Sequence, residues 1–580
     1  MDTQRLILFV IFSFSALFLW EAWQRQNRPA PPPVAATKQA APAAAPGDVP
    51  VPSLTNPGQG PAPGTAPATT PGAPAIPGTS ADATAAAAAA ARTIVVKTDL
   101  YTAEIDPAGG VITRVALDAH RDIDHPEAPY QVLLKTGERT YVAQSGLLGT
   151  GMPNHRTTYE VLPGPRELAA GADRLELKLQ ASAPNGDKVA QTLTFHRGSY
   201  VIDVAYDVTN SGTEPVAPFA YFQLTRDTKQ TGLHNPMAPA SFTGPAIYNE
   251  TDKYKKIEFA DIDKLAADPS KKLPYAKTAD NGWAGMVEQY FVSAWLPSDE
   301  KKTPREFYTR KLDNGLYSVG VIVPVGTVAP GATGAVQVPL YVGPQDQDVL
   351  AKLAKGLDLV VDYGIFTVIA APLFWLLKYL HGFVGNWGWA IILLTIIIKS
   401  AFYPLNHASA RSMAKMKVIA PKLKALQERY ANDKQQLQIK MMEMYKQEKI
   451  NPLGGCLPIL VQIPVFIALY WVLLSAVELR HAPWILWIHD LSAPDPYFVL
   501  PVLYAITAFL QVKLSPTPIS DPVQAKVMQI MPVAFSVMFI FFPSGLVLYW
   551  LVNNMIQIFQ QWHMNRVLTR EAELLAAKRR

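Results

Sequence analysis

The chain has 580 residues, of which 49% are hydrophobic, and its mean hydropathy is +0.09. This balance is too apolar for an ordinary soluble protein of this length and too polar for a bundle of membrane helices alone, so we expect at least two domains. The single cysteine, Cys456, excludes an intrachain disulfide, and the net charge of +5 is modest. We expect no DNA partner.

An apolar, uncharged run at residues 6–20 marks the N-terminal region. Extended through Trp23, it is long enough to span a bilayer. A cleaved signal peptide is the alternative, but no small-x-small site closes the run, which favours an uncleaved signal anchor at 1–24. Residues 25–92 are rich in Pro, Ala, Gly and Thr and are predicted to form a disordered linker.

Apolar and polar residues alternate repeatedly between residues 93 and 345, for example at 175–179. A period of two predicts strands, and regular Gly and Pro punctuation predicts an all-β sandwich. Asn185 and Gly186 stand between two such runs and predict a hairpin with a type I′ turn. The histidines of this region form no metal-binding or catalytic motif, so we expect no catalytic residues, no metal and no cofactor.

Long apolar runs dominate after residue 345. Residues 346–383 combine spaced leucines and lysines with a short apolar stretch and are predicted to form an amphipathic helix at the outer membrane interface. A core at 384–563 is predicted to contain five spans, at about 387–405, 455–477, 497–513, 526–542 and 544–563. With the N-terminal anchor, the count is six.

Charged residues predict the orientation of these spans. The segment 407–450 has ten Lys and Arg against four Asp and Glu, and the tail at 564–580 is also basic. By the positive-inside rule both are cytoplasmic, whereas the loop 478–496 is acidic and lies outside. Six spans with both termini in the cytoplasm and the sandwich outside satisfy these charges, and they leave 346–383 no crossing of its own.

The basic segment 407–450 is predicted to form a hairpin of two amphipathic helices, at about 408–430 and 434–449. Its candidate contact residues are Arg411, Met413, Lys415, Met416 and Lys417. Methionine adapts to variable apolar partners, but it also packs helices together, and both interpretations stay open. The lysines suit lipid headgroups and ribosomal RNA equally.

One charged side chain, Lys399, lies within the first core span. Burying an ammonium in hydrocarbon costs at least about 2.5–3.5 kcal/mol, and no Asp or Glu in the five core spans can neutralise it. A water-filled groove open to the cytoplasm is the simplest solution. The candidate groove residues are polar or aromatic residues of the spans: Thr395, Lys399, Gln462, Gln511, Gln529, Trp550, Asn553 and Asn554.

In the last span, Trp550, Asn553, Asn554 and Gln557 form a stripe at spacings of three and four, which places them on one helix face. Isolated amides in membranes also serve as hydrogen-bonding contacts between helices, and that alternative stays open.

Four segments resemble signatures of the YidC membrane protein insertase family, in its Gram-negative type with a large periplasmic domain. They are FVGNWGWAIILLTIIIKSAFYPL at 383–405, NPLGGC at 451–456, ELRHAPWILWIHDLS at 478–492 and PSGLVLYW at 543–550. The resemblance implies a polytopic α-helical membrane protein with six transmembrane helices, a five-helix core and an all-β periplasmic supersandwich domain.

The same resemblance implies an insertase and chaperone of the bacterial inner membrane. It would receive nascent membrane proteins in a cytoplasm-open hydrophilic groove and release them into the bilayer, alone or with the Sec translocon and its accessory subunits. A ribosome contact through the hairpin and basic tail is also implied. The cation of the family's groove is commonly arginine; Lys399 keeps the charge but not the bidentate fork.

Two other functions compete with this interpretation. A small-solute or ion transporter would use Lys399 as a coupling site, but it would also be expected to have paired acids or inverted repeats, which the core does not clearly contain. A membrane-tethered carbohydrate enzyme would need a constellation of histidine and carboxylates in the sandwich region.

Overall fold

The computed structural model describes residues 48–54, 93–229 without 123, 124 and 126, 241–430 without 301, 433–448, 457–514, 530–531 and 534–579. The expected anchor at 1–24, the NPLGGC motif and Gln529 lie outside these residues, as do residues 526–528, 532 and 533 of the expected span at 526–542.

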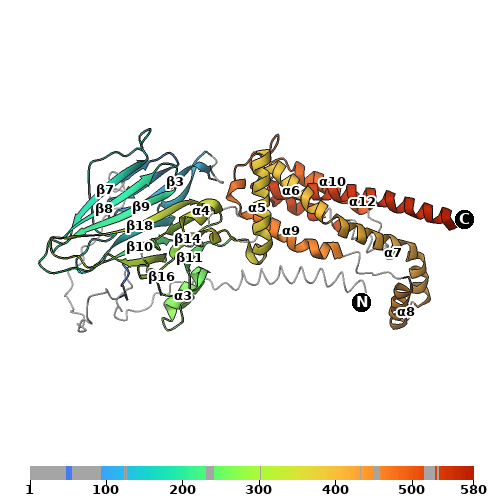
Figure 1. The fold of residues 1–580 in the computed structure, drawn as a ribbon, viewed down its shortest axis with the longest axis horizontal. Helices are drawn as coiled ribbons and strands as arrows, with labels where there is room; N and C mark the ends of the chain where they lie inside the picture. The colour runs from blue at the N-terminus through green and yellow to red at the C-terminus, as the bar shows by residue number, and fades with distance from the viewer. Residues whose placement is uncertain are drawn as a thin grey trace. The chain divides into compact units, whose positions relative to one another are not determined.

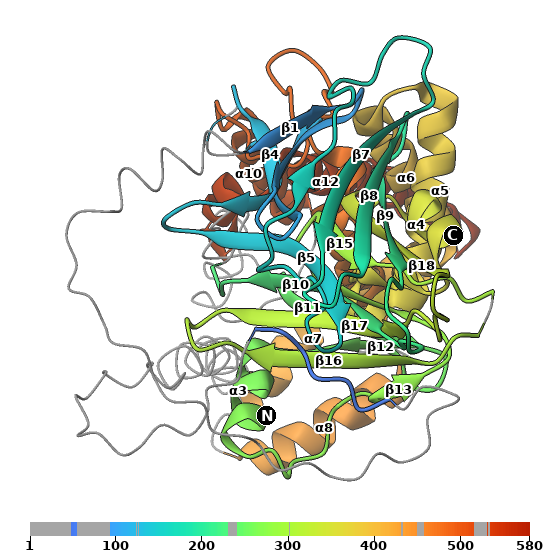
Figure 2. The same cartoon turned by 90° about the vertical axis from the view of Figure 1, so that its left-hand side faces the viewer.

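Two nine-stranded antiparallel sheets form the described part of the sandwich (Figures 1 and 2). The first sheet has the order β1-β2-β3-β4-β5-β10-β17-β16-β13, and the second β12-β11-β14-β15-β18-β9-β8-β7-β6. The strands of the first sheet are β1 (Ile94–Lys97), β2 (Tyr101–Asp106), β3 (Val111–Arg121), β4 (Pro129–Lys135), β5 (Thr140–Leu148), β10 (Phe219–Arg226), β13 (Thr278–Ala279), β16 (Arg305–Lys311) and β17 (Tyr317–Pro324). Those of the second are β6 (Glu160–Val161), β7 (Arg174–Ser182), β8 (Lys188–His196), β9 (Val201–Thr209), β11 (Gly244–Asn249), β12 (Lys253–Lys256), β14 (Trp283–Val287), β15 (Phe291–Trp295) and β18 (Thr333–Pro344).

The alternation in the sequence determines which side chains fill the space between the sheets. In β7, Leu175, Leu177 and Leu179 are buried while the intervening residues are more exposed. In β10 of the other sheet, Phe222 and Leu224 belong to the same core. The predicted all-β sandwich is therefore confirmed.

The hairpin predicted at Asn185 and Gly186 is present between β7 and β8, but its turn type was predicted wrongly. A type I′ turn needs positive φ at both central residues. Only Gly186 has it, at +89°, and its N–H donates to the carbonyl of Ala183, so Pro184 and Asn185 occupy the centre of the turn. Proline, with φ fixed near −65°, is incompatible with type I′ at that position.

Helices predominate in the described chain after residue 345, and one further helix lies between β12 and β13 (Figure 1). They are α3 (Phe259–Ala267), α4 (Gln347–Leu353), η1 (Leu357–Val360), η2 (Gly364–Phe366), α5 (Thr367–Val384), α6 (Trp387–Ala401), α7 (Tyr403–Arg429), α8 (Lys434–Gln447), α9 (Leu457–Ser475), η4 (Val477–Leu479), α10 (Val499–Leu514), η5 (Phe539–Phe541) and α12 (Ser544–Arg579). The two-helix hairpin predicted at 407–450 is present as α7 and α8. The last helix, α12, continues past the expected span end at 563 into the basic tail.

One helix among the described residues, Thr367–Val384, is long and apolar enough by itself to cross a membrane. Trp387–Ala401 together with Tyr403–Ser412 forms a second candidate that is bent by 54°. The apolar helices Leu460–Ser475 and Val499–Leu514 are shorter. The combination of sandwich and helical core is confirmed, whereas the count of six spans stays a prediction.

Three of the four family-like segments meet at one end of α6. The Asn386 side chain caps α6 by accepting from the N–H of Trp389, and it donates to the carbonyl of Pro483 at 2.9 Å. The N–H of Gly545, at the start of α12, donates to the carbonyl of Leu491 at 2.9 Å. The loop after α9 therefore ties the beginnings of α6 and α12 together.

Gly388 allows the loop to approach α6 this closely. A Cβ at this position would lie 2.1 Å from Cδ1 of Trp484, well inside contact distance. We expect Gly388→Val to destabilise the helical core by about 1–3 kcal/mol, because the indole has to move. Thermal unfolding of the detergent-solubilised protein, followed by size-exclusion chromatography, measures this. Gly382→Ala on α5, where the added Cβ meets no atom within 4 Å, is the matched control; equal losses in both would contradict the explanation.

The buried carboxyl of Glu478, which follows α9, should make the stability of the folded protein depend on pH. Burial raises the pKa of its carboxyl to about 7, and the neighbouring Asp346 and Asp348 act in the same direction, while Lys378 opposes them. The folded state therefore holds this proton more tightly than the unfolded state, so its contribution to stability is lost as pH rises from about 4.5 to 7.

We expect Glu478→Gln to remove this part of the pH dependence and to raise the melting temperature at pH 7.5 by about 2–4 °C. Melting curves of both proteins between pH 4.5 and 8 measure it. Glu127→Gln, at an exposed position, should leave the pH profile of the wild type unchanged. Parallel profiles for wild type and Glu478→Gln would contradict the prediction.

Candidate functional site

Lys399 is 2% exposed and points from α6 toward α12. Its Nζ donates to Oε1 of Gln557 at 2.9 Å. Within the described residues, no carboxylate lies within ion-pair distance of this ammonium. A neutral amide therefore solvates the charge without cancelling it.

A second layer of amides lies next to this contact. Gln560 of α12 donates from Nε2 to the backbone carbonyl of Lys399 at 3.5 Å, and Asn406 of α7 donates to Oε1 of Gln560 at 3.3 Å. Asn406 and Gln560 are both buried. The amides join α6, α7 and α12 around the lysine and hold it against α12.

Thr395 lies one turn before Lys399 and is 1% exposed. Its hydroxyl donates to the carbonyl of Ile391 at 2.7 Å, which satisfies the donor within α6. The hydroxyl oxygen retains acceptor capacity, so Thr395 can contribute to a polar lining only as an acceptor.

Gln462 and Asn553 connect α9 with α12, since Nε2 of Gln462 donates to Oδ1 of Asn553 at 3.5 Å. The neighbouring Asn554 is buried, and its Nδ2 has no hydrogen-bond partner in the described part of the chain. Gln511 on α10 is half-buried. Of these amides, Asn554 has the clearest unused donor.

Trp550 lies on α12 one to two turns before these amides and is surrounded by aromatic rings. Its centroid is 4.1 Å from that of Phe466, 5.6 Å from Phe539 and 6.1 Å from Tyr504. Aromatic pairs at such separations add attraction beyond area burial. The aromatic cluster therefore separates the amide region from the loop end of α12.

The structure places Lys399 and Gln462 against α12, where they contact Gln557 and Asn553 of the polar stripe. Sequence reasoning missed Gln560 and Asn406 and did not identify Gln557 as the lysine's acceptor. Gln560 lies three residues after Gln557 and so extends the stripe at the same spacing, which was the available signal.

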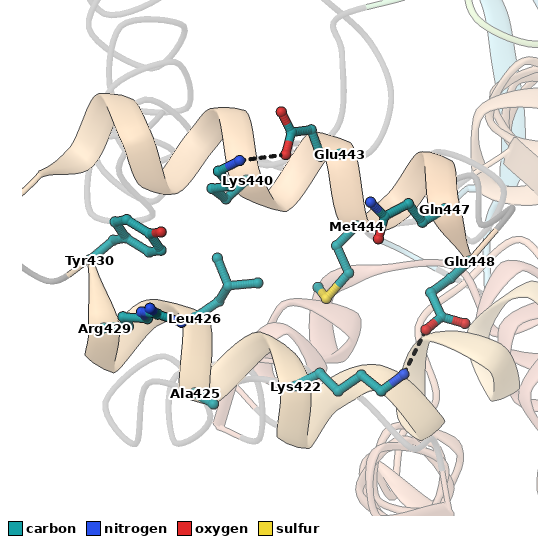
Figure 3. Close-up of a pocket in the computed structure, with 10 residues that line it drawn as sticks. All are labelled: Lys422, Ala425, Leu426, Arg429, Tyr430, Lys440, Glu443, Met444, Gln447 and Glu448. Carbon is teal, nitrogen blue, oxygen red and sulfur yellow. Dashed lines mark hydrogen bonds and ion pairs between the residues drawn. The ribbon is translucent and has the colours of Figure 1, made fainter.

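Figure 3 shows the second candidate site, a cavity of about 570 Å³ between α7 and α8. Two ion pairs flank it, Lys422 with Glu448 at 2.7 Å and Lys440 with Glu443 at 2.8 Å. Met444 is 8% exposed and packs in a small apolar cluster with Ile419. Met444 thus joins the two helices, which favours the packing interpretation for this methionine.

Exposed apolar side chains also occur on the hairpin, since Met442 is 52% exposed. Arg411 is exposed on α7. Met413, Lys415, Met416 and Lys417 lie within α7, and their side chains are outside the described part. Their predicted contacts stay a prediction.

A family model described as the YidC periplasmic domain matches residues 93–376, and one described as the 60Kd inner membrane protein matches residues 379–571. The membrane protein insertase YidC of Aromatoleum aromaticum is 50% identical over 579 residues, which cover 100% of both chains. The corresponding protein of Nitrosospira multiformis is 51% identical over 578 residues, covering 98% of each.

A solved structure, described as an active YidC insertase with the first transmembrane domain resolved, is similar at a TM-score of 0.35 and 19% identity, covering 80% of this chain and 91% of that one. The family resemblance of the four sequence segments is confirmed by the family models and the full-length relatives. The chain belongs to the YidC membrane protein insertases, a family of non-enzymatic bacterial inner membrane proteins with a periplasmic domain.

Proposed function

We propose that this protein inserts nascent membrane proteins into the bacterial inner membrane through a cytoplasm-open hydrophilic groove in which Lys399 is the attracting charge. The observation that carries the proposal is the hydrogen bond from its Nζ to a neutral amide, Gln557. The amide acceptor has no negative charge to cancel that of the ammonium, so an entering carboxylate can replace the amide. At 4 Å and an effective dielectric of 20, two unit charges attract by about 4 kcal/mol.

The amides beside Lys399 suit a transient polar surface. A segment crossing the membrane needs donors and acceptors that replace water, and Asn554 has a buried donor without a partner among the described residues. Gln462, Asn553, Gln511 and Gln529 complete the proposed lining together with Thr395 and Trp550. The lining offers hydrogen bonds without charge, which suits varied substrates.

The proposed topology has six spans, both termini in the cytoplasm and α5 flat on the outer surface. Figure 1 shows that α5 runs across the direction of α9 and α12, which supports an orientation of α5 along the membrane surface. Several of its large apolar side chains are exposed, among them Val368 and Phe383, each at 86%, while Phe374 and Leu377 pack inward. Lys378 pairs with Asp348 of α4.

We further propose that the Sec translocon and its accessory subunits cooperate in insertion, and that the hairpin of α7 and α8 and the basic tail contact the ribosome. The excess of basic residues in 407–450 supports an anionic partner there. The transporter alternative lacks a specific observation in its favour, because the described residues offer Lys399 no carboxylate with which to couple.

Gln557→Glu tests the role of the uncancelled charge. The substitution keeps the shape of the acceptor but gives Lys399 a carboxylate partner, so we expect at least a tenfold loss in insertion of substrates with acidic exported tails. Substrates with neutral tails should lose less than threefold. Insertion into vesicles, measured by protease protection of the tail, separates the two classes.

Gln561→Glu is the matched control, because it places the same charge on the same helix where the side chain contacts Asn565 instead of Lys399. Lys399→Arg, which retains the charge, should insert both classes. Equal losses for acidic and neutral tails in Gln557→Glu would reject the charge-attraction mechanism.

Crosslinking tests the groove itself. A photo-crosslinking residue at position 462 or 550 should capture a stalled nascent chain, whereas one at Val502, exposed at 56% on the surface of α10, should capture little. Capture is measured as the fraction of nascent chain shifted on a gel. Equal capture at the three positions, or none at 462 and 550, would contradict the proposed path.

A further inference from the structure

Residues 48–54, within the region expected to be a disordered linker, contact the outer face of the first sheet. Val49 and Leu54 pack against a separate apolar cluster formed by Leu148, Phe219, Tyr221, Tyr308 and Ile322. In β10, Phe219 and Tyr221 alternate with residues of the main core, so they point away from it. The outer face of the first sheet therefore has an apolar patch of its own, and the linker segment covers it.

A buried histidine binds the acidic end of this segment. Nε2 of His155 donates to Oδ2 of Asp48 at 2.9 Å, and Arg156 forms an ion pair with the other oxygen of the carboxylate. The hydroxyl of Tyr221 donates to Nδ1 of His155. This arrangement uses both ring nitrogens of a neutral imidazole, one as donor and the other as acceptor.

The directions of the pKa shifts of His155 and Asp48 agree with a neutral imidazole that donates to a carboxylate. Burial lowers the pKa of His155, which keeps the ring neutral at pH 7, although Asp48 acts in the opposite direction. Burial acts to raise the pKa of Asp48, but the hydrogen bond and charge of its two partners hold it below the ordinary value. Asp48 is therefore ionised when it is bound.

Side chains of the sheet also bind the backbone of the segment. Arg310 donates from Nη2 to the carbonyl of Asp48 at 3.1 Å and from Nη1 to that of Val49 at 3.3 Å, and Gln223 donates to the same Asp48 carbonyl at 3.4 Å. At the other end, the N–H of Ser53 donates to Oε2 of Glu306 at 2.7 Å. Proline at positions 50 and 52 removes two further donors that would need partners.

The sequence of the segment differs from the rest of the linker. Between residues 29 and 92 the charged residues are Lys38, Asp48, Asp82 and Arg92, and only at 48–54 is an acid followed within six residues by three branched apolar residues. Those features match the histidine and arginine pair and the apolar cluster of the sheet. The segment therefore matches the outer face of the first sheet in charge and in apolar contact, and its two prolines leave fewer backbone donors that need a partner.

We propose that the outer face of the first sheet is a binding site for an extended, proline-containing acidic peptide, and that its occupant is the chain's own segment Asp48–Leu54. Docking shortens the stretch between the expected anchor and the sandwich from residues 25–92 to residues 25–47. At about 3.5 Å per extended residue, the maximum span falls from roughly 240 Å to roughly 80 Å. The site thus limits how far the sandwich can move from the membrane anchor.

Limited proteolysis of the full-length protein in detergent tests the docking. Thermolysin cleaves before Leu54 but not before Val49 or Val51, because a proline follows each valine, and peptide mass spectrometry follows cleavage of the Ser53–Leu54 bond. We expect Arg310→Ala to raise this cleavage rate at least tenfold, and Asp48→Ala, which leaves the sandwich intact, at least threefold. Arg174→Ala on β7 of the other sheet is the control and should not change it. Rates that are the same in the wild type and both test variants would overturn the proposal.

A peptide experiment tests the site independently. The segment 48–54 is replaced by a Gly/Ser heptapeptide, and a fluorescent peptide with the sequence of residues 47–55, GDVPVPSLT, is added. The peptide should bind the replaced protein and not the wild type, and the same peptide with Ala in place of Asp should bind at least tenfold more weakly. Failure of the peptide to bind the replaced protein would overturn the site.

Protection that rises with protein concentration would assign the occupant to a second copy and overturn docking within one chain. Insertion of a neutral-tailed substrate is measured in parallel for each variant. The sheet site and the Lys399 region are separate, so a variant that loses docking should still insert the substrate. The insertion measurement therefore distinguishes a failure of the docking proposal from a failure of the proposed function.

Discussion

The contact between the Lys399 ammonium and the Gln557 amide is the constraint on which the helical core depends. A charge removed from water needs polar partners at hydrogen-bond distance, and these partners have to come from a neighbouring helix. Gln557 supplies one, and Gln560 binds the lysine's own carbonyl. A carboxylate in place of Gln557 would bind more tightly but would cancel the charge, so the amide is the weaker and more permissive partner.

This contact forms only if α6 and α12 are held in register over several turns. The register is set at their beginnings, where Asn386 binds Pro483, Gly388 admits Trp484 and Gly545 binds Leu491. Three of the four segments that resemble signatures of the family are therefore the structural joints of the core. The groups proposed to attract substrate lie more than two helical turns away along the same helices.

Periodicity predicted most of the fold, because burial imposes it directly. Leu175, Leu177 and Leu179 alternate in the sequence because one face of β7 meets the core, and the polar stripe on α12 repeats every three or four residues for the corresponding helical reason. The turn at Gly186 was predicted incorrectly because a dipeptide preference was applied without the preceding proline. The partner of Lys399 could not be predicted from the sequence. Lys399 and Gln557 are 158 residues apart in the chain, and they meet only because of the register between α6 and α12.

The docked segment shows where composition fails as a guide. Averaged over 25–92, the linker has too few apolar residues to build a core, and disorder is the reasonable expectation. Docking needs no core of its own, because the sheet already provides an ordered apolar patch, a buried histidine and an arginine, and only seven residues need to fit them. The ordering entropy is therefore offset locally by a few well-placed contacts. A short exception to the average, with one acid and alternating prolines, carries more structural information than the mean composition of the whole linker.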